Sequence, residues 1–162
     1  GGDNFRRSSR SSRHAQQEQP RPQLFDKILV DAPCSSEGRF KTNDPKTYAF
    51  WSLRKIKEMV RKQRGILLSA SRWLKGDGVL VYSTCSFAPE ENEGVINWLL
   101  RKTQGHLETV PIELANIEAT PAVLKWQGKN FYPQIEHARR ILPNQKMEGF
   151  FIVKLRRTVR NR

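Results

Sequence analysis

The chain has 162 residues, and its hydrophobic content of 37% is sufficient for the core of one globular domain. Its 29 Lys and Arg against 16 Asp and Glu give a formal net charge of +13, which favours a polyanionic partner, with nucleic acid first. No run approaches the roughly 18 apolar residues of a membrane span and no secretory signal is visible, so we expect no membrane partner and a cytoplasmic protein, or a nucleolar one in a eukaryote.

The N-terminal segment, residues 1–24, is rich in Arg, Ser, Gln and Pro and offers scarcely any apolar residue for burial. We predict a flexible basic segment. Such a segment is more often a solvated tail than a specific RNA-binding element. The sequence starts at Gly1 without a methionine, so we do not assume that the chain is complete.

The folded part is predicted over residues 25–157, with a basic tail at 158–162. It starts with an apolar strand over 25–30, which ends at Asp31, and a polar, basic loop follows over 35–51. From Ser52, an N-cap residue, apolar residues recur at helical spacing to Leu74. A turn over 75–78 then leads into a second buried strand over 79–82.

A second helix is predicted from Pro89, because proline fits the first turn and the glutamates that follow suit the positive end of the helix dipole. Beyond residue 105 the pattern weakens. We expect an insert over 122–131, a loop over 139–143 and a final strand over 149–155. The four tryptophans (Trp51, Trp73, Trp98 and Trp126) are expected to pack in the core or at interfaces rather than stack on bases.

An alternation of strand, helix, strand and helix is typical of an α/β domain with a parallel sheet, and it predicts half of a doubly wound domain. Ligands of such folds bind at the carboxyl ends of the strands. Cys34 and Cys85 each lie just beyond the predicted end of a strand. They are the only cysteines, and with three histidines and no C-x-x-C pair they indicate neither a metal site nor a disulfide framework.

Two motifs carry a resemblance to a known family. Asp31-Ala32-Pro33-Cys34-Ser35 is followed about fifty residues later by Tyr82-Ser83-Thr84-Cys85-Ser86, and then by Pro89-Glu90-Glu91-Asn92-Glu93. Together they resemble the Nol/Nop/Sun (RsmB-like) family of S-adenosylmethionine-dependent RNA (cytosine-5)-methyltransferases, over roughly residues 25–157. The resemblance implies the C-terminal half of a Rossmann-like class I methyltransferase sheet, with ribosomal or transfer RNA as substrate.

The resemblance also implies roles for individual residues. Cys85 would be the nucleophile that attacks carbon 6 of cytosine, and Cys34 would assist product release. Asp31 would contact both the cytosine edge and S-adenosylmethionine, while Pro33 shapes the turn beside the cofactor. Candidates for phosphate contacts are Lys41, Arg39 and Arg140.

The family's glycine-rich cofactor loop and ribose-binding acid have no counterpart in this sequence. Asp3 is a candidate remnant of a later acidic cofactor motif. Because three early strands have no counterpart either, we expect the isolated chain to bind S-adenosylmethionine weakly or not at all. A half sheet should also expose an edge and an apolar face.

Alternatives remain open. The chain could be a catalytically incomplete RNA-binding module that retains the fold and the basic surface. Each cysteine could simply be a small residue buried at the end of a strand. Asp31 could be a turn-forming residue before the proline motif. DNA cytosine methylation is disfavoured, because those enzymes use the Pro-Cys cysteine as nucleophile and lack a second one.

Overall fold

The computed structural model describes residues 24–159, so nearly all of the predicted N-terminal segment and the last residues of the tail lie outside the described part. Four elements alternate as the sequence predicts: β1 (Phe25–Asp31), α1 (Leu53–Arg72), β2 (Leu74–Thr84) and α2 (Glu93–Thr103), although α2 begins at Glu93 rather than at Pro89. The predicted final strand is β8 (Phe150–Arg157), and β3 (Leu107–Val110) is a strand that the sequence did not predict. No helix within the described residues is both long and apolar enough to cross a bilayer.

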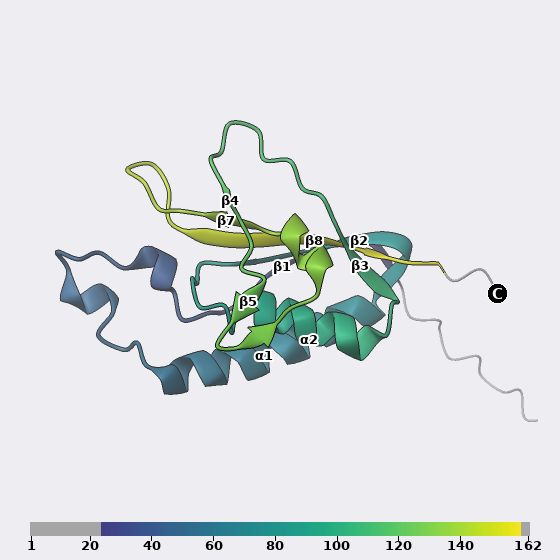
Figure 1. The fold of residues 1–162 in the computed structure, drawn as a ribbon, viewed down its shortest axis with the longest axis horizontal. Coiled ribbons are helices and arrows are strands. Elements are labelled where there is room, and N and C mark those ends of the chain that lie inside the picture. Colours follow the sequence, from purple (N-terminus) through teal and green to yellow (C-terminus); the bar gives the residue numbers. More distant parts are fainter. Residues whose placement is uncertain (1–23, 160–162) are drawn as a thin grey trace, which may run out of the picture.

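The sheet has β1 at one edge, followed by β2 and then β8. β1 runs parallel to β2 with Asp31 opposite Ser83, whereas β8 is antiparallel to β2. Along its other edge β8 pairs with β3 near its end and with β7 (Arg139–Ile141) near its start. α1 and α2 lie side by side against one face of this sheet (Figure 1).

Short elements fill the connections. Two 3-10 helices, Glu37–Arg39 and Pro45–Thr47, interrupt the loop between β1 and α1, and a third, Pro133–His137, precedes β7. β4 (Thr120–Pro121) pairs with β7. β5 (Lys125–Trp126) and β6 (Lys129–Asn130) form a hairpin within the predicted insert, and their turn residues Gln127 and Gly128 both have positive φ, as a tight two-residue turn requires.

Two local predictions need correction. The segment Arg139–Ile141, predicted as a loop, is strand β7, because it completes the free edge of β8 at Phe150–Ile152. The predicted turn over 75–78 lies inside β2: Phe25 pairs with Leu74 and Lys27 already pairs with Val79, so the residues between bulge out of the ladder. Asp77 adopts a φ of 58° there.

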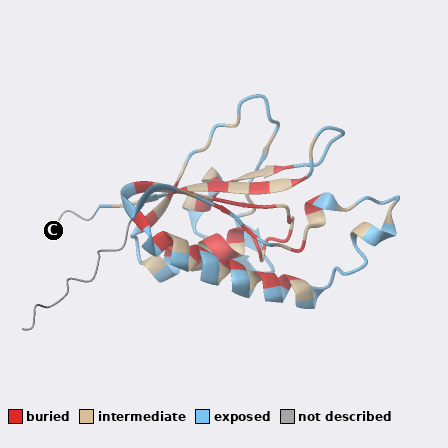
Figure 2. Ribbon diagram, turned by 180° about the vertical axis from the view of Figure 1, so that it is seen from behind, coloured by how far each residue is buried: buried red, intermediate tan, exposed pale blue. Residues whose placement is uncertain are grey.

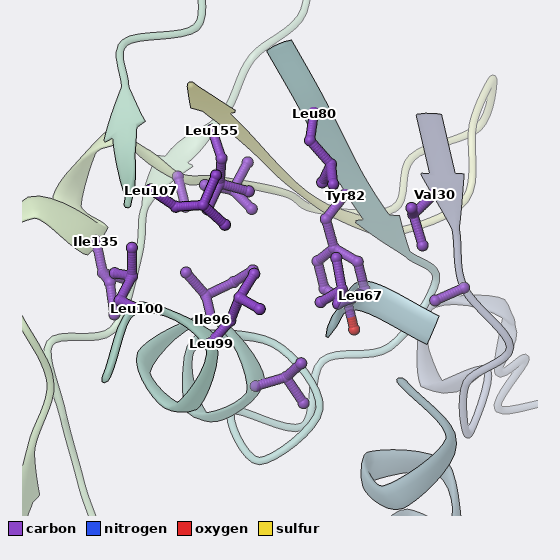
Figure 3. Packing of buried hydrophobic residues seen from close by; sticks show 14 of the residues in the cluster. Val30, Leu67, Leu80, Tyr82, Ile96, Leu99, Leu100, Leu107, Ile135 and Leu155 are labelled. Atoms are coloured by element: carbon purple, nitrogen blue, oxygen red, sulfur yellow. The ribbon is translucent and has the colours of Figure 1, made fainter. Parts of the chain in front are cut away.

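The core lies between the sheet and the two helices. Leu67 of α1 and Ile96 and Leu99 of α2 meet Leu80 and Tyr82 of β2, and all five are fully buried (Figure 3). Buried residues of the helices lie on the side that faces the sheet, and their opposite side is exposed (Figure 2). The amphipathic pattern read from the sequence therefore sets the position of both helices.

β1 is a free edge among the described residues, since its only described partner is β2. Leu29 is 70% exposed and Phe25 49% exposed on this strand. Together with Ile28, Ala70 and Trp73 they line an open apolar surface. The exposed edge and apolar face predicted for a half sheet are thus present.

Candidate active site at the ends of two parallel strands

Cys34 and Cys85 meet at the carboxyl edge of the sheet. Cys85 follows directly after β2 and Cys34 lies in the loop after β1. Because the two strands are parallel and in register at Asp31 and Ser83, their ends lie side by side. The two Sγ atoms are 2.9 Å apart, and both cysteines are free thiols and only partly exposed. The structure thus places both cysteines where the sequence predicts them, at the carboxyl edge of the sheet.

The two thiols share a proton unequally. A hydrogen bond from Cys34, a contact with Ser36 and the positive charge of Arg39 outweigh the effect of burial and lower the pKa of Cys85 to about 6. Ser36 Oγ lies 3.7 Å from Cys85 Sγ. The hydrogen bond with Cys85, burial and the neighbouring negative charge raise the pKa of Cys34 strongly. These opposite directions favour Cys85 as the thiolate, the nucleophilic form, with Cys34 as its hydrogen-bond donor.

Glu91 holds the two cysteine loops together. Its side chain is completely buried, and its carboxylate accepts hydrogen bonds from the Ser35 amide at 3.0 Å and from Ser86 Oγ at 2.9 Å. It also accepts a hydrogen bond from Gln63 Nε2 of α1 at 2.8 Å. Ser35 follows Cys34 and Ser86 follows Cys85, so one carboxylate fixes both thiols relative to the helix.

The turn that carries Cys85 is fixed by buried polar groups. Thr84 Oγ1 donates to Asn92 Oδ1 at 2.6 Å, and Asn92 Nδ2 donates to the Ser86 carbonyl at 2.8 Å. The Gly38 amide donates to the Cys85 carbonyl at 2.8 Å. A Cβ on Gly38 would lie 2.2 Å from the Gly149 carbonyl oxygen, so only glycine allows this approach of the loop to Cys85.

The residues predicted for the cofactor and the cytosine edge lie at the same edge. Asp31, the last residue of β1, is exposed and accepts a hydrogen bond from Ser83 Oγ at 2.9 Å. Pro33 is exposed too, and its carbonyl accepts from Gln63 Nε2 at 2.9 Å. Asp3 lies outside the described residues. The exposed residues Asp31 and Pro33 therefore lie on the surface at the end of β1, and Asp31 contributes a carboxylate to that surface.

The predicted phosphate contacts fall into two groups. Arg39 and Lys41 are exposed on the loop beyond Cys34, where Arg39 forms a solvent-exposed pair with Glu148 at 3.0 Å. Arg140 instead pairs with Glu93 at 2.6 Å, with side-chain exposures of 11% and 0%. A phosphate contact at Arg140 would require this buried pair to open.

Sequence reasoning did not assign the residues that position the cysteines. Gln63 is one polar residue within a helical pattern, and Glu91 belongs to the family motif and to the acidic helix start, neither of which assigns it a contact with the cysteine loops. The motif Pro89-Glu90-Glu91-Asn92-Glu93 was the available signal, because three carboxylates at a helix start are more than the dipole needs. Glu91 and Glu93 are buried and Glu90 is not, a difference that depends on how the turn enters α2.

Three of the four tryptophans are more exposed than predicted. Trp51, Trp73 and Trp126 are 42%, 45% and 39% exposed, whereas Trp98 is partly buried and packs against the core as predicted. Trp51 donates from Nε1 to Glu37 Oε1 at 2.7 Å, in the loop that contacts the Cys85 turn. The described residues contain no group of three or more His, Cys, Asp and Glu side chains arranged to hold a metal ion.

Comparison with known proteins gives consistent results. Residues 6–156 match the family described as 16S rRNA methyltransferase RsmB/F. The chain is 40% identical over 134 residues to tRNA (cytosine(49)-C(5))-methyltransferase of Pyrococcus abyssi, which covers 82% of the chain and 42% of that protein. It is 36% identical over 137 residues to ribosomal RNA small subunit methyltransferase F of Pectobacterium carotovorum, covering 85% of the chain and 26% of that protein.

Solved structures agree with the sequence relatives. A methyltransferase homolog protein from Pyrococcus horikoshii superimposes with a TM-score of 0.68 at 36% identity, over 83% of this chain and 39% of its own. NSun6 from Pyrococcus horikoshii, solved with SFG, gives a TM-score of 0.60 at 31% identity, over 82% and 30% of the two chains. The chain thus spans less than half of the length of these relatives.

Proposed function

Because the chain belongs to the RsmB/F methyltransferase family, we propose that it carries the catalytic cysteines of an RNA (cytosine-5)-methyltransferase. In this proposal the complete protein transfers a methyl group to carbon 5 of cytosine through a covalent adduct with Cys85. The observation that carries the proposal is the pair of cysteines at the carboxyl ends of two parallel strands, with Sγ atoms 2.9 Å apart.

The reaction needs a thiolate because carbon 5 of neutral cytosine is a weak nucleophile. When Cys85 Sγ adds to carbon 6, a carbon–sulfur bond forms and the electron pair of the 5,6 double bond becomes available at carbon 5. S-adenosylmethionine, when bound, supplies the methyl group that this carbon takes up. A carboxyl group at the cytosine edge stabilises the adduct, and Asp31, exposed beside the cysteines, is the candidate for that role.

Cys34 suits the release step. After methyl transfer, carbon 5 carries both the methyl group and its original hydrogen, which must leave as a proton before the double bond can re-form. In the adduct Cys85 is a neutral thioether, so the charge and hydrogen bond that raise the pKa of Cys34 are gone. Cys34 can then give its own proton to solvent and, as a thiolate, accept the carbon 5 proton. The electron pair of that carbon–hydrogen bond re-forms the 5,6 double bond, the carbon–sulfur bond breaks, and Cys85 departs as a thiolate.

The proposal that the protein uses S-adenosylmethionine rests on the family match and on the exposed surface at the end of β1. Asp31 and Pro33 are both exposed there, so they fit one side of a pocket for S-adenosylmethionine. The other walls would come from sequence outside the described residues, next to the free edge of β1. We therefore propose that residues 24–159 alone hold the cofactor weakly.

The proposed substrate is ribosomal or transfer RNA. The two relatives described above are named as a tRNA methyltransferase and a methyltransferase of small-subunit ribosomal RNA. On the loop beyond Cys34, the exposed side chains of Arg39 and Lys41 could contact phosphates near the target nucleotide. These contacts would position the RNA without selecting its sequence.

Methyl transfer by the complete protein, with any sequence upstream of residue 1, tests the proposal. Purified protein is incubated with labelled S-adenosylmethionine and separate tRNA and rRNA pools, and the modified nucleoside is identified by mass spectrometry. We expect 5-methylcytosine with wild type and none with Cys85→Ala, while Ser69→Ala, on the exposed side of α1, retains activity. RNA binding without methyl transfer by the wild type would instead support a binding module.

A further inference from the structure

A basic groove lies on the outer side of the two helices, between α1, α2 and the β5–β6 hairpin. Its volume is about 700 Å³. The hairpin lies across the helices at this position (Figure 1). Six of the residues that line it are cationic: Lys57, Arg61, Arg64, Arg101, Lys102 and Lys129. Trp98, Trp126 and Phe131 line it as well.

The positive charge of the basic groove is not neutralised by the described part of the chain. None of the six cations forms an ion pair with a described carboxylate, although Lys62, on the same helix, pairs with Glu58. Glu90 is the one acidic residue among those that line the groove. Its carboxylate already accepts hydrogen bonds from Trp126 Nε1 at 2.9 Å and Gln127 Nε2 at 3.2 Å, which anchor the hairpin. Six like charges in one groove repel one another unless an anion joins them.

The aromatic residues of the groove are placed for contact with flat groups. The guanidinium of Arg64 lies over the Trp98 ring, 5.3 Å from its centroid. Arg64 Nε is buried and has no hydrogen-bond partner among the described residues. Trp126 is 39% exposed, and its Nε1 donates to Glu90 Oε1 at 2.9 Å, so the ring is held in the lining of the groove while part of it remains exposed.

We propose that the basic groove binds a single-stranded segment of the substrate RNA that flanks the target cytosine. Phosphates would contact the cations, and a base would stack on Trp126. The interleaving of cations with exposed aromatic rings matches a nucleotide chain, in which phosphates alternate with flat bases. An acidic peptide would satisfy the charges only. The proposal rests on the proposed function, because it takes the bound RNA to be the methylation substrate.

The groove is joined to the cysteine site through two pairs of neighbouring residues. Arg64 lines the groove and Gln63 contacts Glu91 and the Pro33 carbonyl. Glu90 lines the groove and Glu91 fixes both cysteine loops. Residues that line the groove are therefore direct chain neighbours of residues that position the cysteine loops, and in this proposal a strand whose cytosine reaches Cys85 continues into the groove.

The test uses the complete protein and a fluorescein-labelled single-stranded RNA of mixed sequence, with binding measured by anisotropy at several salt concentrations. Arg61→Gln with Lys102→Gln removes two groove charges. Arg72→Gln with Lys75→Gln removes two exposed charges outside the groove, one at the end of α1 and one in β2, where Lys75 pairs with Asp26, and is the control. The slope of log affinity against log salt concentration is negative, and the loss of two phosphate contacts should reduce its magnitude by about 1.4. The control should keep the wild-type slope.

Kinetics separate the groove from the catalytic site. We expect the groove variant to raise KM for RNA and to leave kcat near the wild-type value, because no groove residue touches the reacting atoms. Trp126→Leu should weaken binding without changing the salt slope. Wild-type RNA affinity and slope in the groove variant would overturn the inference, even with methyl transfer intact, and the proposed function would stand. If polyglutamate binds the wild type as tightly as RNA does, and the groove variant loses this binding, the inference would be overturned in favour of an acidic protein partner.

Discussion

Removing one partner of the buried ion pair between Arg140 and Glu93 is expected to destabilise the fold strongly. Arg140 donates from Nε and Nη2 to the two oxygens of Glu93, at 2.8 and 2.6 Å, and from Nη1 to the Phe87 carbonyl at 3.0 Å. Glu93 is fully buried, and the Val123 amide is its other donor, at 2.9 Å. Arg140→Met removes the only cation paired with this carboxylate and leaves a buried charge uncompensated.

The expected loss follows from burial. Breaking a buried pair by removing one partner costs about 3–5 kcal/mol, because the remaining charge stays out of water. Arg156 and Glu108 form a similar pair at 2.6 Å, but their side chains are 52% and 38% exposed. Arg156→Met should therefore cost only about 0–1 kcal/mol. The difference between the two variants isolates the effect of burial.

Urea unfolding, followed by tryptophan fluorescence, measures both variants. With a slope of about 2 kcal/mol per molar urea, Arg140→Met should lower the midpoint by about 2 M, and Arg156→Met by less than about 0.5 M. Adding Glu93→Gln to Arg140→Met should recover part of the loss, because no charge is then left buried. Equal midpoints for the two single variants would refute the reasoning. If Arg140→Met fails to fold, Arg140→Lys, which keeps the charge but not the two-pronged geometry, should show an intermediate loss.

Three other predictions concern the site itself. Gly38→Ala should abolish most methyl transfer, since its Cβ would lie 2.2 Å from the Gly149 carbonyl oxygen and displace the loop that holds the Cys85 carbonyl; unchanged turnover would contradict this. Alkylation of Cys85 by iodoacetamide should rise with pH through about 6, as the thiolate forms, and Cys34→Ala should move this midpoint upward, because it removes the hydrogen bond that lowers the pKa. Glu91→Gln, which keeps the shape but loses the charge that accepts from both loops, should lower kcat more than it raises KM for RNA, and a pure KM effect would argue against a positioning role.

The meeting of the two cysteines was predictable, because it depends on local patterns. Two apolar strands joined by an amphipathic helix favour a right-handed parallel crossover, and that topology alone brings Cys34 and Cys85 to one edge. Which of the two is the thiolate was not predictable in the same way. It depends on Ser36 and Arg39, whose positions are set by the irregular loop after β1.

The partners of Arg140 could not be read from the chain. Glu93 lies 47 residues earlier, and the pair forms only because β7 joins the edge of β8. β7 itself has three residues, two of them arginines, so it carries no alternation of apolar and polar residues that would predict a strand. The basic groove is likewise a product of tertiary structure, because α1, α2 and the β5–β6 hairpin each contribute part of its charge.

Covalent capture of RNA tests the role of the cysteines most directly. The complete protein carrying Cys34→Ala is incubated with RNA and S-adenosylmethionine and analysed on a denaturing gel, beside wild type and the double variant Cys34→Ala with Cys85→Ala. If Cys85 forms the adduct and Cys34 releases it, a protein–RNA complex that survives denaturation accumulates in Cys34→Ala and is absent from the double variant. An adduct that persists without Cys85, or active methyl transfer without it, would contradict the account.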